Sequence, residues 1–156
     1  MEKVRFGIIG LGNQGSQYAV NIFDRGLIEN GRLTAVCDTV PARIRAIREK
    51  ISPDRIAFFD DCNKMLDSGL VDAVLVEVPH YLHPMIVTEC LKRNIHVICE
   101  KPAGVYTKQV REMNEAAAES KALFTMMFNQ RTNSLYRKMR ELIASGGIGK
   151  LQRFTW

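Results

Sequence analysis

Three glycines at fixed offsets, Gly10, Gly12 and Gly15, lie between a short apolar run and a segment with helical periodicity. The apolar run, residues 4–9, contains β-branched side chains and predicts a strand. A second apolar run, residues 32–37, follows the helical segment and is closed by an aspartate. This order of strand, glycine turn, helix, strand and acid predicts a βαβ unit.

Each glycine meets a different steric demand of such a unit. Gly10 lets the chain turn sharply off the first strand, and Gly15 lets the helix pack close to that strand. Gly12 has no Cβ, so a pyrophosphate can approach the backbone. The helix that begins near Asn13 and Gln14 points unpaired N–H groups and its positive dipole end at the same place. The pattern therefore predicts a dinucleotide site.

The acid at the end of the second strand indicates which dinucleotide binds. Asp38 lies about 20 residues beyond the glycine turn, where a carboxylate accepts hydrogen bonds from the adenosine ribose. A carboxylate there repels a 2′-phosphate, so NAD is favoured over NADP, although the nearby Arg43 would soften that preference. The alternative is that the glycines mark only a tight strand-to-helix turn, but this leaves the surrounding strands and acid unexplained.

Length and composition fit an ordinary globular domain. The chain has 156 residues, enough for one domain with a core, and 46% hydrophobic and 25% charged residues are typical of soluble proteins. No apolar run is long enough to span a bilayer. The N-terminal residues enter the first strand without the apolar segment of a signal peptide, so a cytoplasmic location is expected.

The cysteines do not form a recognisable metal or redox motif. None belongs to a C-x-x-C pair, and all lie in or beside apolar segments, as small buried hydrophobes do. Disulfides are not expected in a reducing compartment. A redox or metal role for Cys99 is the alternative, because it neighbours a candidate site motif. The four positions are Cys37, Cys62, Cys90 and Cys99.

The net charge of +5 is concentrated at one end of the chain. Residues 131–156 hold six basic residues and one acidic residue, and the remainder is balanced. A basic tail can bind nucleic acid. The alternative is the solvated face of a helix, or a surface that meets another domain. We favour this alternative and expect no nucleic-acid or membrane partner, because Leu135, Met139 and Leu142 recur at helical spacing.

Strand and helix patterns alternate along the whole chain. The expected strands are residues 4–9, 32–37, 56–59, 72–78, 95–99 and 122–128. The expected helices are residues 13–25, one that begins at Pro41, a short one after Asp60, one that begins at His83-Pro84, one at Thr107, and residues 134–145. Such alternation predicts an α/β fold with a doubly wound parallel sheet, the Rossmann fold, whose ligand lies across the carboxyl ends of the strands.

Several residues are expected to begin or end these helices. Asp60 is expected to cap the third helix and Thr107 the fifth, since both side chains can accept a bond from a free backbone N–H. Ser145-Gly146-Gly147 is a C-cap signal for the last helix. Residues 148–156 are expected to begin a further strand.

Unusual residues follow the fourth and fifth expected strands. The fourth ends in Glu77-Val78-Pro79-His80-Tyr81-Leu82-His83-Pro84, and the fifth in Cys99-Glu100-Lys101-Pro102. Both ends should project into the ligand crevice. His80 and His83 at i, i+3 could suggest a metal site, but no third ligand stands out. His96 lies within the fifth strand and is interpreted as a core or interface histidine.

The glycine turn, the Pro-His-x-x-His segment and Glu-Lys-Pro, in this order, resemble the Gfo/Idh/MocA family, which includes glucose–fructose oxidoreductase and inositol dehydrogenase. The resemblance covers the whole chain. It implies that the three glycines hold a pyrophosphate and that Asp38 holds the adenosine ribose. It implies that Lys101 is the catalytic lysine, and that Glu100 contacts the nicotinamide ribose region. It places the following residues beside the cofactor or the site: Pro79, His80 (often Asn in relatives), His83, Asn129, Gln130 and Arg131.

The implied reaction is oxidation of a secondary hydroxyl of a sugar or cyclitol, with hydride passing to nicotinamide. It requires removal of the hydroxyl proton. Lysine has an unperturbed pKa of about 10.4 and is a poor base at neutral pH. Burial or nearby positive charge lowers that pKa, so Lys101 could relay the proton or polarise the substrate oxygen. A Glu100 carboxylate facing the ammonium would oppose the shift.

The resemblance also implies a second α/β domain that supplies substrate contacts. On this interpretation residues 1–147 form the NAD(P)-binding Rossmann domain and residues 148–156 begin the C-terminal substrate domain, which is absent from this chain. The chain alone should bind a dinucleotide but barely turn over substrate, and the full-length protein should be a homo-oligomer. Two other functions stay open, an NAD-dependent glycosidase and a non-catalytic dinucleotide sensor. Product analysis and Lys101→Ala separate them.

Overall fold

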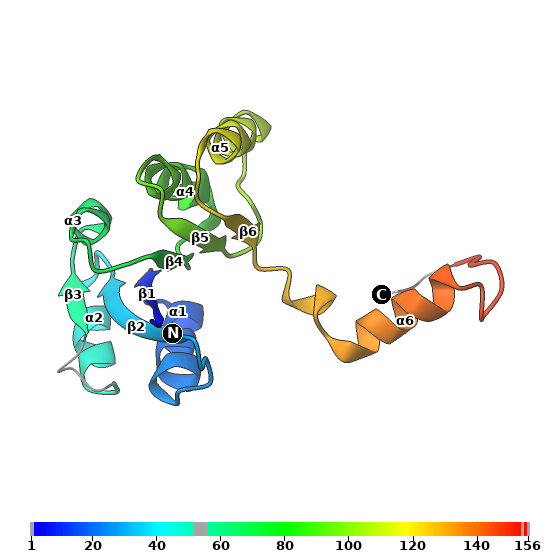
Figure 1. Cartoon of the computed structure of the whole chain (residues 1–156), viewed down its shortest axis with the longest axis horizontal. Helices are drawn as coiled ribbons and strands as arrows, with labels where there is room; N and C mark the ends of the chain where they lie inside the picture. Colours follow the sequence, from blue (N-terminus) through cyan, green and yellow to red (C-terminus); the bar gives the residue numbers. More distant parts are fainter. Residues whose placement is uncertain (1, 52–55, 154, 156) are drawn as a thin grey trace.

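The sheet of this protein is fully parallel and has six strands in the order β3-β2-β1-β4-β5-β6 (Figure 1). The computed structural model describes residues 2–51, 56–153 and 155. The strands are β1 (Val4–Ile9), β2 (Gly31–Cys37), β3 (Ala57–Phe59), β4 (Ala73–Val76), β5 (His96–Cys99) and β6 (Phe124–Met126). The doubly wound parallel sheet predicted from the sequence is confirmed. The order reverses between β1 and β4, which is the place where such sheets bind ligands.

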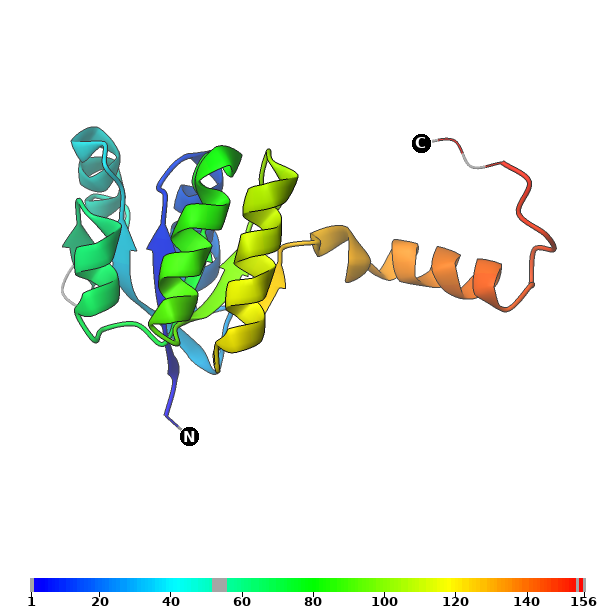
Figure 2. The same ribbon diagram turned by 90° about the horizontal axis from the view of Figure 1, so that it is seen from above.

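Helices cover both faces of the sheet, with α3, α4 and α5 on one face and α1 and α2 on the other (Figures 1 and 2). The predicted helix over residues 13–25 is continuous, but its second half is π-helical. The helices are α1 (Asn13–Tyr18), η1 (Ala19–Asp24), α2 (Pro41–Arg48), α3 (Cys62–Asp67), η3 (His80–Leu82), α4 (His83–Lys92), α5 (Thr107–Glu119), η4 (Asn129–Arg131) and α6 (Ser134–Ala144). The last of these, α6, extends away from the sheet (Figure 2).

Two apolar cores lie on opposite faces of the sheet. In β4 the side chains of Val74 and Val76 belong to the core beneath α4 and α5, whereas Leu75 belongs to the core beneath α1 and α2. All four residues of β4 are buried, as expected for a central strand covered on both sides. The buried strand β4 therefore fixes the position of the segment that directly follows it.

The cysteines are part of this core. Cys37, Cys90 and Cys99 are fully buried, and Cys62 packs against them half-buried. Burial raises the pKa of each fully buried thiol to about 12, so these side chains are neutral at physiological pH. The interpretation as small buried hydrophobes is confirmed, and the neutral thiol of Cys99 argues against a redox role.

Two strands are three or four residues shorter than predicted, because their partners end first. β4 stops at Val76 instead of residue 78, since the neighbouring strand turns away at Gly10. β6 covers only residues 124–126 instead of 122–128, because this edge strand pairs only with β5 over Val97–Cys99. Hydrophobicity alone does not report the length of a neighbouring strand.

Two predicted caps are wrong by one residue. Asp61, and not Asp60, caps α3, because its carboxylate accepts a hydrogen bond from the Lys64 backbone N–H at 2.9 Å. Thr107 is the first residue of α5 and makes no side-chain capping bond. Adjacent residues that can both cap are not distinguished by composition; the backbone angles of the preceding loop decide between them.

The C-terminal end of α6 is as predicted, but the strand after it is not found. Gly146 adopts φ +71°, and the Gly147 N–H donates to the Leu142 carbonyl at 3.0 Å. Among residues 148–153 none is in a strand, because no strand edge lies beside them to pair with. Residues 154 and 156, which the same prediction included, lie outside the described residues.

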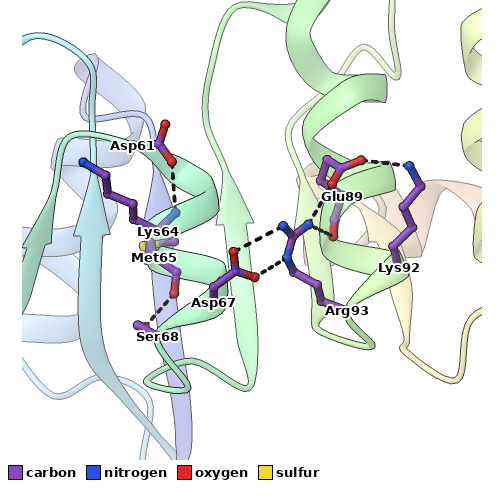
Figure 3. A network of polar contacts seen from close by, with 8 residues as sticks. All are labelled: Asp61, Lys64, Met65, Asp67, Ser68, Glu89, Lys92 and Arg93. Carbon is purple, nitrogen blue, oxygen red and sulfur yellow. Dashed lines mark hydrogen bonds and ion pairs between the residues drawn. The ribbon is translucent and has the colours of Figure 1, made fainter.

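A network of ion pairs joins α3 to α4 on the surface (Figure 3). The Arg93 guanidinium donates to Asp67 and to Glu89, each at 2.7 Å, and Lys92 pairs with Glu89 at 2.9 Å. Hydrogen bonding to Arg93 lowers the pKa of Asp67, and hydrogen bonding to Lys92 and Arg93 lowers that of Glu89. Both carboxylates are therefore stabilising above their unfolded pKa, and that contribution is lost as pH falls through the folded pKa.

We expect Arg93→Ala to lower the melting temperature by only a few degrees at pH 7, because exposed ion pairs contribute little. The difference from wild type should shrink in 1 M salt and below pH 4, since salt screens the pairs and acid neutralises the carboxylates. Lys64→Ala, which removes an exposed pair with Asp60, is the control and should change nothing. Thermal unfolding measures both, and a difference that grows in salt would contradict the assignment.

Candidate functional site

The glycine turn closes the end of β1 against β2 and β4. Gly10 adopts φ +98°, and its N–H donates to the Cys37 carbonyl at 2.8 Å. A Cβ on Gly10 would lie 2.6 Å from the backbone oxygen of Glu77. Both the backbone angle and the space therefore require glycine here, as the sequence predicted.

The other two glycines differ sharply in their surroundings. A Cβ on Gly15 would overlap the carbonyl oxygen of Gly10, so only glycine lets α1 pack against the end of β1. A Cβ on Gly12 would meet no atom within 4 Å. Gly12 is the N-cap of α1 and its open side leaves the turn's backbone accessible. The steric demand on Gly15 comes from the fold, whereas nothing in the fold itself requires glycine at position 12.

Asp38 ties the glycine turn to the segment after β2. Its buried carboxylate accepts hydrogen bonds from the backbone N–H of Leu11 at 2.7 Å and of Val40 at 2.8 Å. The Arg43 guanidinium approaches the same carboxylate at 3.3 Å. Asp38 therefore fixes the shape of the turn, and Arg43, whose side chain is half exposed, lies at the rim beside it.

A crevice runs across the carboxyl ends of the central strands in two adjoining pockets, of about 480 Å³ and about 320 Å³. Gln14, Glu77 and Val78 line both pockets. The larger is also lined by Gly10, Gly12, Asn13, Asp38, Arg43 and Pro79, and the smaller by His80, His83, Glu100, Lys101 and Asn129. The structure thus brings all the predicted cofactor residues except the buried Gly15 to one crevice.

Two predicted neighbours of the site lie elsewhere. Gln130 and Arg131 line a different hollow, of about 860 Å³, that runs along α6. This hollow is larger than either pocket of the crevice, but its lining residues belong to η4 and α6 and include none from the strand ends or the glycine turn. The volume of a hollow therefore does not identify the candidate site in this protein. We assign the site to the crevice because the carboxyl ends of the central strands converge there.

The Glu-Lys-Pro segment after β5 is held by α1. The Glu100 carboxylate accepts a bond from the Tyr18 hydroxyl at 3.3 Å and from the Lys101 backbone N–H at 2.9 Å. Burial raises the pKa of Tyr18, so this hydroxyl remains a donor. Glu100 therefore faces α1 and the backbone, while Lys101 is exposed at the mouth of the smaller pocket.

His83 joins the two strand-end segments. The side chain is 1% exposed, with Nδ1 2.7 Å from the Pro102 carbonyl and Nε2 2.9 Å from the Val78 carbonyl. Both ring nitrogens are engaged with the backbone, so His83 positions these segments and is not disposed to bind a metal. The other histidine of interest, His96, is half-buried and accepts a bond from the N–H of Leu123, the residue before β6, at 2.8 Å.

Glu77 belongs to the motif at the end of the fourth expected strand, but nothing in the sequence assigned it a role of its own. It is 9% exposed, and among the described residues neither carboxylate oxygen has a hydrogen-bond partner. Burial, with a smaller contribution from the charge of Glu100, raises its pKa to about 8. The available signal was a single acid within the apolar run of residues 73–78.

Comparison with known proteins places the chain in a family. Residues 4–128 match the oxidoreductase family with an NAD-binding Rossmann fold named GFO_IDH_MocA. The chain belongs to this family. Within the described part of this family member no helix is long and apolar enough to cross a membrane.

Similar proteins include inositol dehydrogenases of bacteria. The chain is 31% identical over 147 residues to myo-inositol 2-dehydrogenase of Thermotoga maritima, covering 94% of this chain and 42% of the relative. It is 30% identical to inositol 2-dehydrogenase of Rubrobacter xylanophilus, covering 95% and 42%. Among solved structures it is similar to scyllo-inositol dehydrogenase from Lactobacillus casei with bound NAD(H) and scyllo-inositol (TM-score 0.86, 27% identity, covering 96% and 43%). The chain therefore spans less than half the length of these relatives.

The crevice of this family member fits a dinucleotide. Gly12 leaves open space over the turn where a pyrophosphate needs the backbone. Asp38 lies at the end of β2, where the adenosine ribose is held in such folds, and the smaller pocket lies beyond β4. Together the two adjoining pockets extend from Asp38 to the segment that carries Lys101.

Proposed function

We propose that this chain is the cofactor-binding part of an NAD-dependent oxidoreductase that oxidises a secondary hydroxyl of a cyclitol or a sugar. The observation that carries the proposal is the convergence of the glycine turn, Asp38 and the Lys101 segment on one crevice. The names of the relatives, myo-inositol 2-dehydrogenase and inositol 2-dehydrogenase, support a cyclitol as the first substrate to test.

In this proposal the glycine turn binds the pyrophosphate and Asp38 the adenosine ribose. The bound nicotinamide supplies the hydride acceptor. The open side of Gly12 and the N–H groups of Asn13 and Gln14 form the phosphate contact. NAD is preferred because a 2′-phosphate would approach the Asp38 carboxylate, while the half-exposed Arg43 softens that repulsion.

Lys101 removes the substrate proton or polarises the substrate oxygen. The Glu100 carboxylate accepts hydrogen bonds from the Tyr18 hydroxyl and from the backbone N–H of Lys101, which fixes the start of the segment that carries the lysine. His83 holds the segment of Lys101 against the segment that carries His80, because it contacts the carbonyls of Val78 and Pro102. The two segments therefore form one rigid wall of the smaller pocket.

We also propose that residues 1–147 act as the cofactor domain and that residues 148–156 begin a second α/β unit, which supplies substrate contacts. The support is the coverage of relatives, 42–43% of their length, and the exposed apolar side chains on and after α6, including Leu135 at 77% and Ile148 at 60%. A cytoplasmic homo-oligomer remains part of this proposal.

The test is Lys101→Ala in the longest natural form of the protein, assayed with NAD and myo-inositol. We expect net cofactor reduction by wild type, a loss of kcat of about 100-fold or more in the variant, and NAD affinity within about threefold of wild type. Lys108→Ala, an exposed lysine on α5, is the control and should leave kcat unchanged. Unchanged turnover in Lys101→Ala would contradict the catalytic role. In a parallel assay with a glycoside in place of myo-inositol, sugar release without net cofactor reduction would favour the glycosidase alternative.

A further inference from the structure

Glu77 occupies the point where the two halves of the crevice meet. Its N–H donates to the Ile9 carbonyl at 2.8 Å, so it directly continues β4 beside β1 at the reversal of strand order. Its Cβ lies 3.2 Å from the position that a Cβ on Gly15 would take, and its main chain lies against Gly10. Glu77 lines both pockets. The side chain is therefore packed directly behind the glycine turn.

No positive charge compensates Glu77 in the described part of the chain. Its carboxylate oxygens are buried without hydrogen-bond partners. Ionisable groups approach it from every neighbouring element: Tyr18 of α1, Cys99 of β5, Glu100 after β5, and His80, His83 and Lys101 around the smaller pocket. Those that interact with it electrostatically are Glu100, Tyr18 and Cys99, none of which is cationic. An ionised Glu77 would therefore be an unpaired buried anion.

A pyrophosphate on the glycine turn would bring further negative charge to the same place. Two anions separated by a thin layer of buried protein repel strongly, because little water screens them. We propose that Glu77 is a proton-binding residue of the dinucleotide site, whose carboxyl must be neutral when a pyrophosphate occupies the turn, so that binding at alkaline pH requires uptake of a proton. The inference rests on the proposed use of the crevice for a dinucleotide.

The direction and size of the pH effect follow from linkage. In the free chain the pKa of Glu77 is raised to about 8, and a bound pyrophosphate raises it further. Below pH 7 the carboxyl is neutral in both states, so affinity does not depend on it. Above pH 8 the free chain must first bind a proton, and affinity should fall by about tenfold between pH 7 and pH 9.

The experiment is calorimetric titration of this chain with ADP-ribose, NAD and NADH at pH 7, 8 and 9, for wild type, Glu77→Gln and Glu115→Gln. ADP-ribose keeps the pyrophosphate but has no nicotinamide, so it isolates the proposed repulsion from any effect of nicotinamide charge. We expect wild type and Glu115→Gln, an exposed control on α5, to lose about tenfold in affinity for ADP-ribose by pH 9. Glu77→Gln should lose less than about threefold, because its amide cannot ionise.

A second measurement uses the wild-type chain alone. Carbon-13 NMR titration of the Glu77 carboxyl should give a higher pKa with saturating ADP-ribose than without it. An unchanged or lower pKa in the complex, or equal pH dependence in wild type and Glu77→Gln, would overturn the inference while leaving the dinucleotide site intact. Absence of any binding at pH 7 would instead overturn the proposed function, and this inference with it.

Discussion

Gly15→Ala is expected to destabilise the fold by about 3 kcal/mol or more. The added Cβ would overlap the carbonyl oxygen of Gly10 and press on the Cβ of Glu77, which are a backbone atom and a buried side chain. Neither can rotate away, so α1 must separate from the end of β1 and open the core around Ala19. Chemical and thermal denaturation measure this loss directly.

Gly12→Ala is the matched control for that prediction. It adds the same methyl group three residues earlier, where no atom lies within 4 Å and the φ of −66° suits alanine. We expect a loss of at most about 1 kcal/mol, from the poorer N-cap. Equal destabilisation by the two variants would mean that the packing of α1 on β1 is not what requires glycine at position 15.

Glu77→Gln is expected to become progressively more stable than wild type as the pH rises. The folded chain keeps a proton on Glu77 up to about pH 8, whereas the unfolded chain releases it near pH 4.5. Because the folded state binds more protons, wild-type stability falls with rising pH, by about 1.4 kcal/mol per pH unit between these values. The variant lacks this dependence.

From pH 5 to pH 8 the difference in melting temperature between Glu77→Gln and wild type should therefore widen by roughly 10 °C, and should level off above pH 8. Thermal unfolding at several pH values gives the result. Glu115→Gln removes an exposed carboxylate from α5 and should follow wild type throughout. A constant difference between Glu77→Gln and wild type would show that Glu77 is already ionised in the folded protein.

Much of the fold could be predicted because its signals are local. The glycine turn, the apolar runs and the helix starts at Pro41 and His83 each reflect the geometry of a few adjacent residues. The end of β4 and the length of β6 could not be predicted, because each depends on where a partner strand distant in the sequence stops. The choice of Asp61 over Asp60 as a cap depends on backbone angles that composition does not carry.

The residues that line the candidate crevice could be predicted from the sequence, but the contacts among them could not. Motifs at strand ends identified Asp38, Glu100 and Lys101, because parallel topology brings those ends together. The sequence could not show that Glu100 faces Tyr18, since that contact spans 82 positions. Nor could it show that Glu77 is buried without a partner, because an acid that follows an apolar strand is as readily exposed as enclosed.

The most direct measurement is calorimetric titration of NAD into wild type and Gly12→Ala at pH 7. We expect Gly12→Ala to keep the fold, because its Cβ meets no atom within 4 Å, but the methyl group would occupy the open space over the turn where the pyrophosphate must approach the backbone. We expect wild type to bind NAD, and the variant to bind at least about tenfold more weakly with an almost unchanged melting temperature. Equal affinity in the two proteins would contradict the claim that the glycine turn holds the cofactor.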